Sequence, residues 1–147
     1  MIPVIFINCT DHPYIDDIMN GTKTYETRTR NTLKALLSWA LGERVLIAET
    51  GRGTPVVRCS AVIDHFGSVY TEDRWDSLRN VHCVPEGSKY DWKSDTKVKW
   101  LYHLSDVRPV EPFIPDGIRH GRVWMECNRI DKKILRSDIT KSIDTII

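Results

Sequence analysis

The chain has 147 residues, of which 41% are hydrophobic and 28% are charged, and its formal net charge is +1. This length suits one domain and is too short for two cores of ordinary size, while the hydrophobic content excludes a disordered chain. The near-neutral charge argues against a protein that coats long duplexes, because such binding depends on neutralising many phosphates. A locally basic pocket for one nucleotide or a short strand is still compatible with it.

The first half of the chain is predicted to alternate strands with short helices. The opening apolar run lacks a basic leader and is too short for a signal peptide or a membrane span, so we expect a buried first strand in a cytoplasmic protein that does not contact membranes. Hydrophobic spacing and turn residues then predict a helix from Pro13 to Gly21, a strand over 24–29, a helix over 32–41, and a strand hairpin over 44–49 and 56–64.

The second half is predicted to contain a helix over 71–83, an exposed loop over 85–97, a strand over 98–104, a proline-punctuated stretch over 109–115, a basic turn over 117–121 and a last strand over 123–127. We place the domain at residues 1–128. The tail, 129–147, has apolar residues at helical spacing and is expected to pack on the body rather than on a second copy. The oligomeric state is left open. Short strands mixed with helices favour an α+β fold, a compact barrel rather than a parallel doubly wound sheet.

The four cysteines stand far apart and form no CxxC pair, which predicts reduced, buried thiols rather than a disulfide or metal framework. His82-Cys83 is the one place where a metal site could begin, but no second ligand pair with zinc-like spacing follows it. We therefore predict no metal and no cofactor.

One polar segment stands out between the first predicted helix and the third predicted strand. In an extended chain the side chains alternate between two faces, so Thr24, Glu26 and Arg28 point one way and Tyr25 points the other. Glu26 and Arg28 can then form a charge-assisted pair that leaves guanidinium donors for a ligand, and Lys23 can enter the same space. On the charge spacing alone, an ordinary surface ion pair on a solvated edge strand is the favoured explanation.

The residues Gly21-x-Lys23-x-x-Glu26-x-Arg28 match the G-x-K-x-x-E-x-R signature of ASCH domains, which belong to the PUA-like superfamily. The strand from Gly42 onward and the closing Gly121-Arg122-Val123-Trp124 also resemble that family, so the similarity covers about residues 2–127. The resemblance implies a small PUA-like β-barrel with flanking helices, and a cleft lined by Lys23, Glu26 and Arg28.

The resemblance also implies two functions. In the first, which we favour, the cleft binds single-stranded RNA or a modified nucleotide or nucleoside. Binding of this kind needs phosphate contacts, a ring for stacking and groups that read base edges. The residues expected to supply them are Lys23, Arg28 and Arg30 for phosphate, Tyr25 and Trp100 for stacking, Glu26 for a base amino group, and Arg122 in a second basic group.

In the second, the chain is a small hydrolase, either an amidohydrolase that acts on acylated nucleosides such as acetylcytidine or a ribonuclease. Lys23 would be its base or nucleophile, with Glu26 and the Thr24 hydroxyl beside it. The amidohydrolase branch carries a threonine where this chain has Glu26. We expect Glu26 to raise the pKa of Lys23, the wrong direction for a neutral lysine.

Overall fold

The computed structural model of the chain describes residues 2–28, 41–92, 98–115 and 124–127. The predicted helix over 32–41, the basic turn over 117–121 and the tail over 129–147 lie outside these ranges, as do Arg30 and Arg122. The boundary placed at residue 128 therefore stays a prediction.

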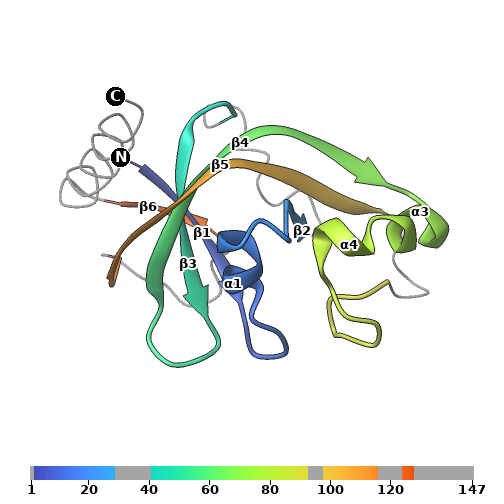
Figure 1. Cartoon of the computed structure of the whole chain (residues 1–147), viewed down its shortest axis with the longest axis horizontal. Helices are drawn as coiled ribbons and strands as arrows, with labels where there is room; N and C mark the ends of the chain where they lie inside the picture. Colours follow the sequence, from blue (N-terminus) through green and yellow to red (C-terminus); the bar gives the residue numbers. More distant parts are fainter. Residues whose placement is uncertain (1, 29–40, 93–97, 116–123, 128–147) are drawn as a thin grey trace.

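The described residues form one mixed sheet of six strands in the order β2-β5-β4-β3-β1-β6 (Figure 1). Strand β1 pairs in parallel with β3, and every other pair in the sheet is antiparallel, including the predicted β3–β4 hairpin. The strands are β1 (Ile2–Asn8), β2 (Tyr25–Arg28), β3 (Arg44–Thr50), β4 (Val56–Val69), β5 (Lys99–Phe113) and β6 (Trp124–Cys127).

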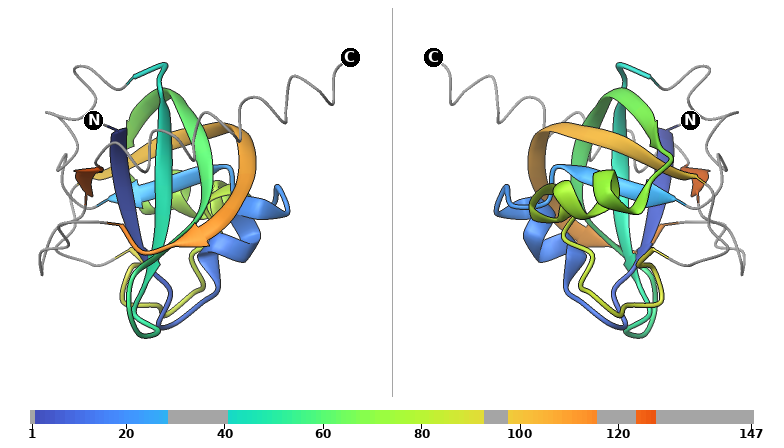
Figure 2. Two further views of the ribbon diagram at one scale, coloured as in Figure 1. Left: turned by 90° about the vertical axis from the view of Figure 1, so that its left-hand side faces the viewer. Right: turned by 90° about the vertical axis from the view of Figure 1, so that its right-hand side faces the viewer.

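The predicted α+β class is confirmed. Figure 2 shows that the long strands β4 and β5 bend strongly, so the sheet curls rather than lying flat. In the part of the chain that the structure describes, β2 and β6 remain the two edges and do not pair with each other. Closure into a barrel is thus not established by the strand pairing.

The strand pairs differ from the sequence-based expectation at β4 and β5. We expected β4 to end at Asp64 and the proline-rich stretch to follow a short strand, but β4 continues to Val69 and β5 continues to Phe113. Within β5, Pro109 lies opposite Cys59 of β4. Because β2 pairs only with residues 100–103 of β5, the later residues have no described strand on that side, where a missing N–H costs no ladder hydrogen bond.

Among the described residues, three short helices cover one side of the sheet: α1 (Tyr14–Met19), α3 (Glu72–Ser77) and α4 (Arg79–His82). The first lies within the predicted helix, whereas the single helix predicted over 71–83 is divided at Leu78, whose φ of −102° and ψ of 7° interrupt the helical backbone. Apolar side chains of α1 and Trp75 of α3 join the sheet residues in the larger hydrophobic core. No helix in the described part of the chain is long and apolar enough to cross a membrane.

Candidate functional site

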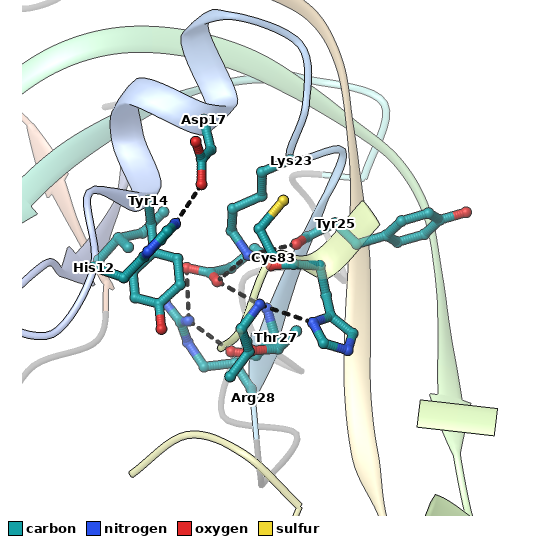
Figure 3. Close-up of polar contacts among 12 residues, drawn as sticks. His12, Tyr14, Asp17, Lys23, Tyr25, Thr27, Arg28 and Cys83 are labelled. Carbon is teal, nitrogen blue, oxygen red and sulfur yellow. Dashed lines mark hydrogen bonds and ion pairs between the residues drawn. The ribbon is translucent and has the colours of Figure 1, made fainter. Parts of the chain in front are cut away.

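The polar segment singled out in the sequence forms the short edge strand β2, and its side chains alternate as predicted. Glu26 and Arg28 lie opposite Tyr102 and Trp100 of β5, so these four side chains share one face of the sheet. Tyr25 lies opposite His103 on the other face. Figure 3 shows the Tyr25 ring directed away from Lys23 and Arg28.

Lys23 is fully enclosed, with 1% of its surface exposed. It lies between α1 and β2, where its backbone N–H donates to the carbonyl oxygen of Asp17 at 2.9 Å. Its Nζ donates to the carbonyl oxygens of Tyr25 at 2.7 Å and His82 at 2.6 Å, and lies 3.6 Å from Oε1 of Glu26. The ammonium therefore joins β2 to the C-terminal end of α4 through two hydrogen bonds, and it also forms an ion pair with Glu26.

Glu26 connects the two cations of the segment. It is 4% exposed, and its Oε2 lies 2.9 Å from Nη1 of Arg28 while its Oε1 accepts a hydrogen bond from the backbone N–H of Thr27 at 2.8 Å. The order ammonium, carboxylate, guanidinium is thus built into six consecutive residues. The Glu26 carboxylate therefore bridges Lys23 and Arg28, and Lys23 is not an isolated lysine.

Arg28 connects the edge strand β2 to strand β1, near the other edge of the sheet. Its Nη2 donates to the carbonyl oxygen of Phe6 in β1 at 2.9 Å, and its Nη1 donates to the carbonyl oxygen of Thr27 at 2.9 Å. Its side chain is 14% exposed, more than that of Lys23 or Glu26. Arg28 is therefore the charged member of the segment that a ligand from solvent reaches first.

The burial of the segment sets its ionisation. Burial lowers the pKa of Lys23, and the negative charge of Glu26 opposes this shift without reversing it. The expected effect of Glu26, which raises the pKa of Lys23, is therefore present, but the net shift is downward because Lys23 is fully desolvated, which the sequence did not show. Burial also acts to raise the pKa of Glu26, but the charges of Arg28 and Lys23 outweigh it and hold that pKa below its ordinary value.

Two buried atoms of the segment keep unused hydrogen-bonding capacity. Among the described residues, neither Oε2 of Glu26 nor Nε of Arg28 has a hydrogen-bond partner, although both are hidden from solvent. The 2.9 Å contact of Oε2 with Arg28 is an ion pair without hydrogen-bond alignment. Buried polar atoms are usually satisfied, so one open acceptor beside one open donor calls for an explanation. A ligand group that offers both a donor and an acceptor would supply one.

The sequence did not reveal every neighbour of Lys23. The ring of Tyr14 lies 5.2 Å from its Nζ, at cation–π distance, and burial raises the pKa of the Tyr14 phenol, whose hydroxyl donates to Asp11 at 3.2 Å. Lys23, Tyr14 and Cys83 appear close together in Figure 3. Since Tyr14 begins α1 and the His82 carbonyl ends α4, no spacing in the sequence indicated that either group would meet Lys23.

Several predicted site residues are not brought to this network. Tyr25 faces the opposite side of β2, so it does not offer its ring to a ligand at Glu26 and Arg28. The contacts of Nζ of Lys23 are with carbonyl and carboxylate oxygens, not with the hydroxyl of Thr24. Trp100, by contrast, lies directly opposite Arg28 and is partly buried.

The pair His82-Cys83 is not arranged as the start of a metal site. His82 is fully buried and stacks on Trp75 with 3.8 Å between ring centroids. Its Nε2 donates to the Trp75 carbonyl oxygen at 3.0 Å and its Nδ1 accepts from the Val84 N–H at 2.9 Å, so both ring nitrogens are engaged. Burial lowers the pKa of His82 to about 4.

Comparison with known proteins supports the fold suggested by the motif. No protein-family model and no curated protein matches this sequence. A crystal structure of ASCH from Zymomonas mobilis matches with a TM-score of 0.70 and 20% identity, over 92% of this chain and 93% of that chain. Two mutant forms of that protein match with TM-scores of 0.69 and 0.70, at 21% and 20% identity, over 92% of this chain and 94% and 96% of theirs.

The protein is thus a small α+β domain with one curled mixed sheet. Its fold is similar over nearly the whole chain to that of the Zymomonas mobilis structures. The particular fold is that of ASCH proteins, as the Gly21-x-Lys23-x-x-Glu26-x-Arg28 motif predicted.

Proposed function

We propose that this chain is an ASCH domain that binds single-stranded RNA or a modified nucleoside in a cleft beside Glu26 and Arg28. The observation that carries the proposal is the pair of buried, unsatisfied atoms, Oε2 of Glu26 and Nε of Arg28. A nucleobase edge offers a matching set of groups, since an exocyclic amino group donates and a neighbouring carbonyl or ring nitrogen accepts. Glu26 would accept from the amino group, and Arg28 would donate to the acceptor.

Trp100 supports the same proposal with a flat surface. It stands across from Arg28 on β5 and is incompletely buried, so part of its ring is available for a base to stack on. Stacking of one base on an aromatic side chain contributes about 1–3 kcal/mol. Arg30 and Arg122, which lie outside the described residues, are proposed to add phosphate contacts. The proposal includes closure of the sheet into a PUA-like barrel, supported by the 2.9 Å bond from Arg28 to Phe6 that links edge strand β2 to β1.

Binding is tested with fluorescently labelled single-stranded RNA and with a panel of free nucleosides, using anisotropy and calorimetry. Arg28→Lys keeps the charge but removes Nε as a donor beside Glu26, and we expect it to weaken binding about tenfold or more, because a charge-assisted hydrogen bond contributes about 1.5–3 kcal/mol. Glu26→Gln should change which bases bind, since a carboxylate accepts only and an amide also donates.

The chain offers a matched control for Arg28. Arg108 follows Asp106 by two residues, as Arg28 follows Glu26, and its Nη2 contacts the Asp106 carboxylate at 2.8 Å. The side chains of Arg108 and Asp106 are 21% and 50% exposed, so Arg108→Lys changes a similar pair that solvent reaches more easily. Equal loss of affinity in Arg28→Lys and Arg108→Lys would indicate general attraction of phosphate to positive charge. Unchanged affinity in Arg28→Lys, with the fold intact by circular dichroism, would refute the proposed site.

One observation favours the hydrolase alternative, namely that burial lowers the pKa of Lys23, as a catalytic lysine requires. Against it, Nζ is enclosed, donates to the carbonyl oxygens of Tyr25 and His82, and is ion-paired with Glu26. Incubation with acetylcytidine and with short RNA, followed by chromatography, distinguishes the two functions. Release of cytidine, or cleavage of RNA, that is lost in Lys23→Arg would establish catalysis. If neither substrate yields a product but RNA or a nucleoside binds measurably, the hydrolase alternative is refuted and the binding function is supported.

A further inference from the structure

A second polar cluster lies on the other face of β2, β5 and β4, and the proposed binding function makes no use of it. Asp64 is its centre: Oδ1 of Asp64 contacts Nδ1 of His103 at 2.7 Å and Nδ1 of His65 at 2.9 Å. The two imidazole rings stack with 4.5 Å between centroids and 19° between planes. One ligand atom from each of the three residues lies within 4.8 Å of those of the other two.

The backbone explains why neighbours in sequence reach the same point. Ile63 pairs with Leu104 and His65 pairs with His103, so Asp64 is an extra residue in β4 and forms a β-bulge. Consecutive side chains of a regular strand point to opposite faces, whereas a bulge places two residues opposite one and redirects a side chain. The bulge therefore lets both Asp64 and His65 reach His103.

We propose that Asp64, His65 and His103 bind one divalent transition-metal ion of the zinc type. Two imidazole nitrogens and one carboxylate oxygen form a ligand set that zinc accepts at bond lengths of about 2.0–2.2 Å, which separates the ligand atoms of a tetrahedral site by roughly 3.3 Å. The contacts of 2.7 and 2.9 Å lie just below that separation and the outer limit of 4.8 Å lies above it, so the three ligand atoms are already near metal-binding spacing. Two imidazoles favour zinc, copper or nickel over magnesium or calcium, which prefer oxygen ligands.

The surroundings suit an exchangeable metal rather than an enclosed structural one. The side chains of His65 and Asp64 are 57% and 41% exposed, so a water molecule or another solvent-derived ligand can take the fourth position. Tyr25 contacts the ring nitrogen of His65 that is not the proposed ligand: its hydroxyl oxygen lies 3.2 Å from Nε2 of His65. When that nitrogen donates to the Tyr25 oxygen, the lone pair of Nδ1 is free for the metal, which is the usual role of a group behind a ligating histidine.

Zinc binding by the full chain is measured by competition with a chromophoric chelator, and Co²⁺ is used as a second probe because its visible absorption reports tetrahedral coordination by protein ligands. We expect one equivalent of zinc to bind at micromolar concentration or tighter. His65→Ala and His103→Ala should each lower the affinity at least tenfold and weaken the Co²⁺ absorption, while circular dichroism stays unchanged because the cluster lies at the surface.

Two variants serve as controls. His12 is also paired with a carboxylate, that of Asp17, but it lies on α1's side of the molecule, so His12→Ala should retain the parent affinity. Cys83 is a partly exposed thiol, and unchanged affinity in Cys83→Ser would show that this thiol is not a zinc ligand. The proposal is overturned if zinc fails to bind at 100-micromolar concentration, about −5.5 kcal/mol in binding free energy, or if His65→Ala and His103→Ala bind it as tightly as the parent chain.

Discussion

Strand β2 carries polar side chains on both of its faces, and the two faces differ in almost every physical respect. On one face Glu26 and Arg28, together with Lys23, form a chain of charges that is nearly closed to solvent. On the other, Tyr25 meets two imidazoles and Asp64 in a cluster that is largely open. The same short strand therefore supports one charged network inside the protein and one titratable cluster at its surface.

The difference shows how burial decides what a polar cluster contributes. A buried charge that loses its partner keeps its full desolvation cost, so the inner network holds β2, α4 and β1 in fixed positions and tolerates little change. An exposed ion pair contributes only about 0–1 kcal/mol, because water replaces a lost partner. The outer cluster can thus exchange its partners for a ligand without loss of the fold. Three substitutions test this contrast.

The largest effect is expected for Lys23→Met, which keeps most of the side-chain volume but removes the ammonium. Two carbonyl oxygens and part of the Glu26 charge would lose their partner inside the protein. Loss of one member of a buried ion pair costs about 3–5 kcal/mol. We therefore expect the free energy of unfolding, measured in urea, to fall by an amount in this range.

Lys89→Met is the matched control for that experiment. Nζ of Lys89 lies 5.0 Å from the ring centroid of Tyr90, much as Nζ of Lys23 lies 5.2 Å from that of Tyr14, but Lys89 is exposed. Its substitution should change the free energy of unfolding by about 0.5 kcal/mol or less. Similar losses in both variants would mean that the aromatic contact, not the buried hydrogen bonds, accounts for the stability that Lys23 provides.

A smaller, pH-dependent effect is expected for Glu26→Gln. The pKa of Glu26 in the folded protein lies below the unfolded value of about 4.3. The ionised carboxylate therefore stabilises the fold above the unfolded pKa, and this contribution disappears as the pH falls through the folded pKa. The amide that replaces the carboxylate in the variant does not titrate. The parent should be more stable than Glu26→Gln by about 2 kcal/mol near pH 7, and the gap should narrow below about pH 4.

Urea unfolding at a series of pH values from 7 to 3 measures that gap. Glu111→Gln, an exposed position on β5, is the control and should follow the parent at every pH. A gap between parent and Glu26→Gln that is constant across the series would contradict a carboxylate held ionised by Arg28 and Lys23.

Much of the inner face could be predicted from the sequence because it depends on local geometry. The alternation of an extended strand is enough to place Glu26 with Arg28 and Tyr25 opposite to them, and the structure confirms it. The motif also indicated the ASCH fold, which the solved structures support. The net pKa shift of Lys23 could not be predicted, because it depends on enclosure by α1 and α4, whose positions no spacing in the sequence reveals.

The outer face could not be predicted for a related reason. Asp64, His65 and His103 are brought together by the register of β4 against β5 and by one bulge, over a separation of about forty residues. A bulge leaves little trace in a sequence, so the sequence did not indicate this cluster, and the only metal site considered was His82-Cys83. The lengths of β4 and β5 were underestimated for the same reason: pairing between long strands overrode the local signals of Pro109 and Asp64.

The smallest effect on the free energy of unfolding is expected for Tyr25→Phe, which should nevertheless lower the zinc affinity of the outer cluster. The substitution removes only the hydroxyl bonded to Nε2 of His65 and keeps the ring, which contacts the His103 ring at 4.9 Å between centroids. Because the lost bond is exposed, the free energy of unfolding should change by about 0.5 kcal/mol or less. The zinc affinity should nonetheless fall about tenfold, since groups that orient a ligating histidine typically contribute that much. If the chelator competition instead shows unchanged affinity in Tyr25→Phe while His65→Ala abolishes binding, His65 ligates the metal without help from Tyr25.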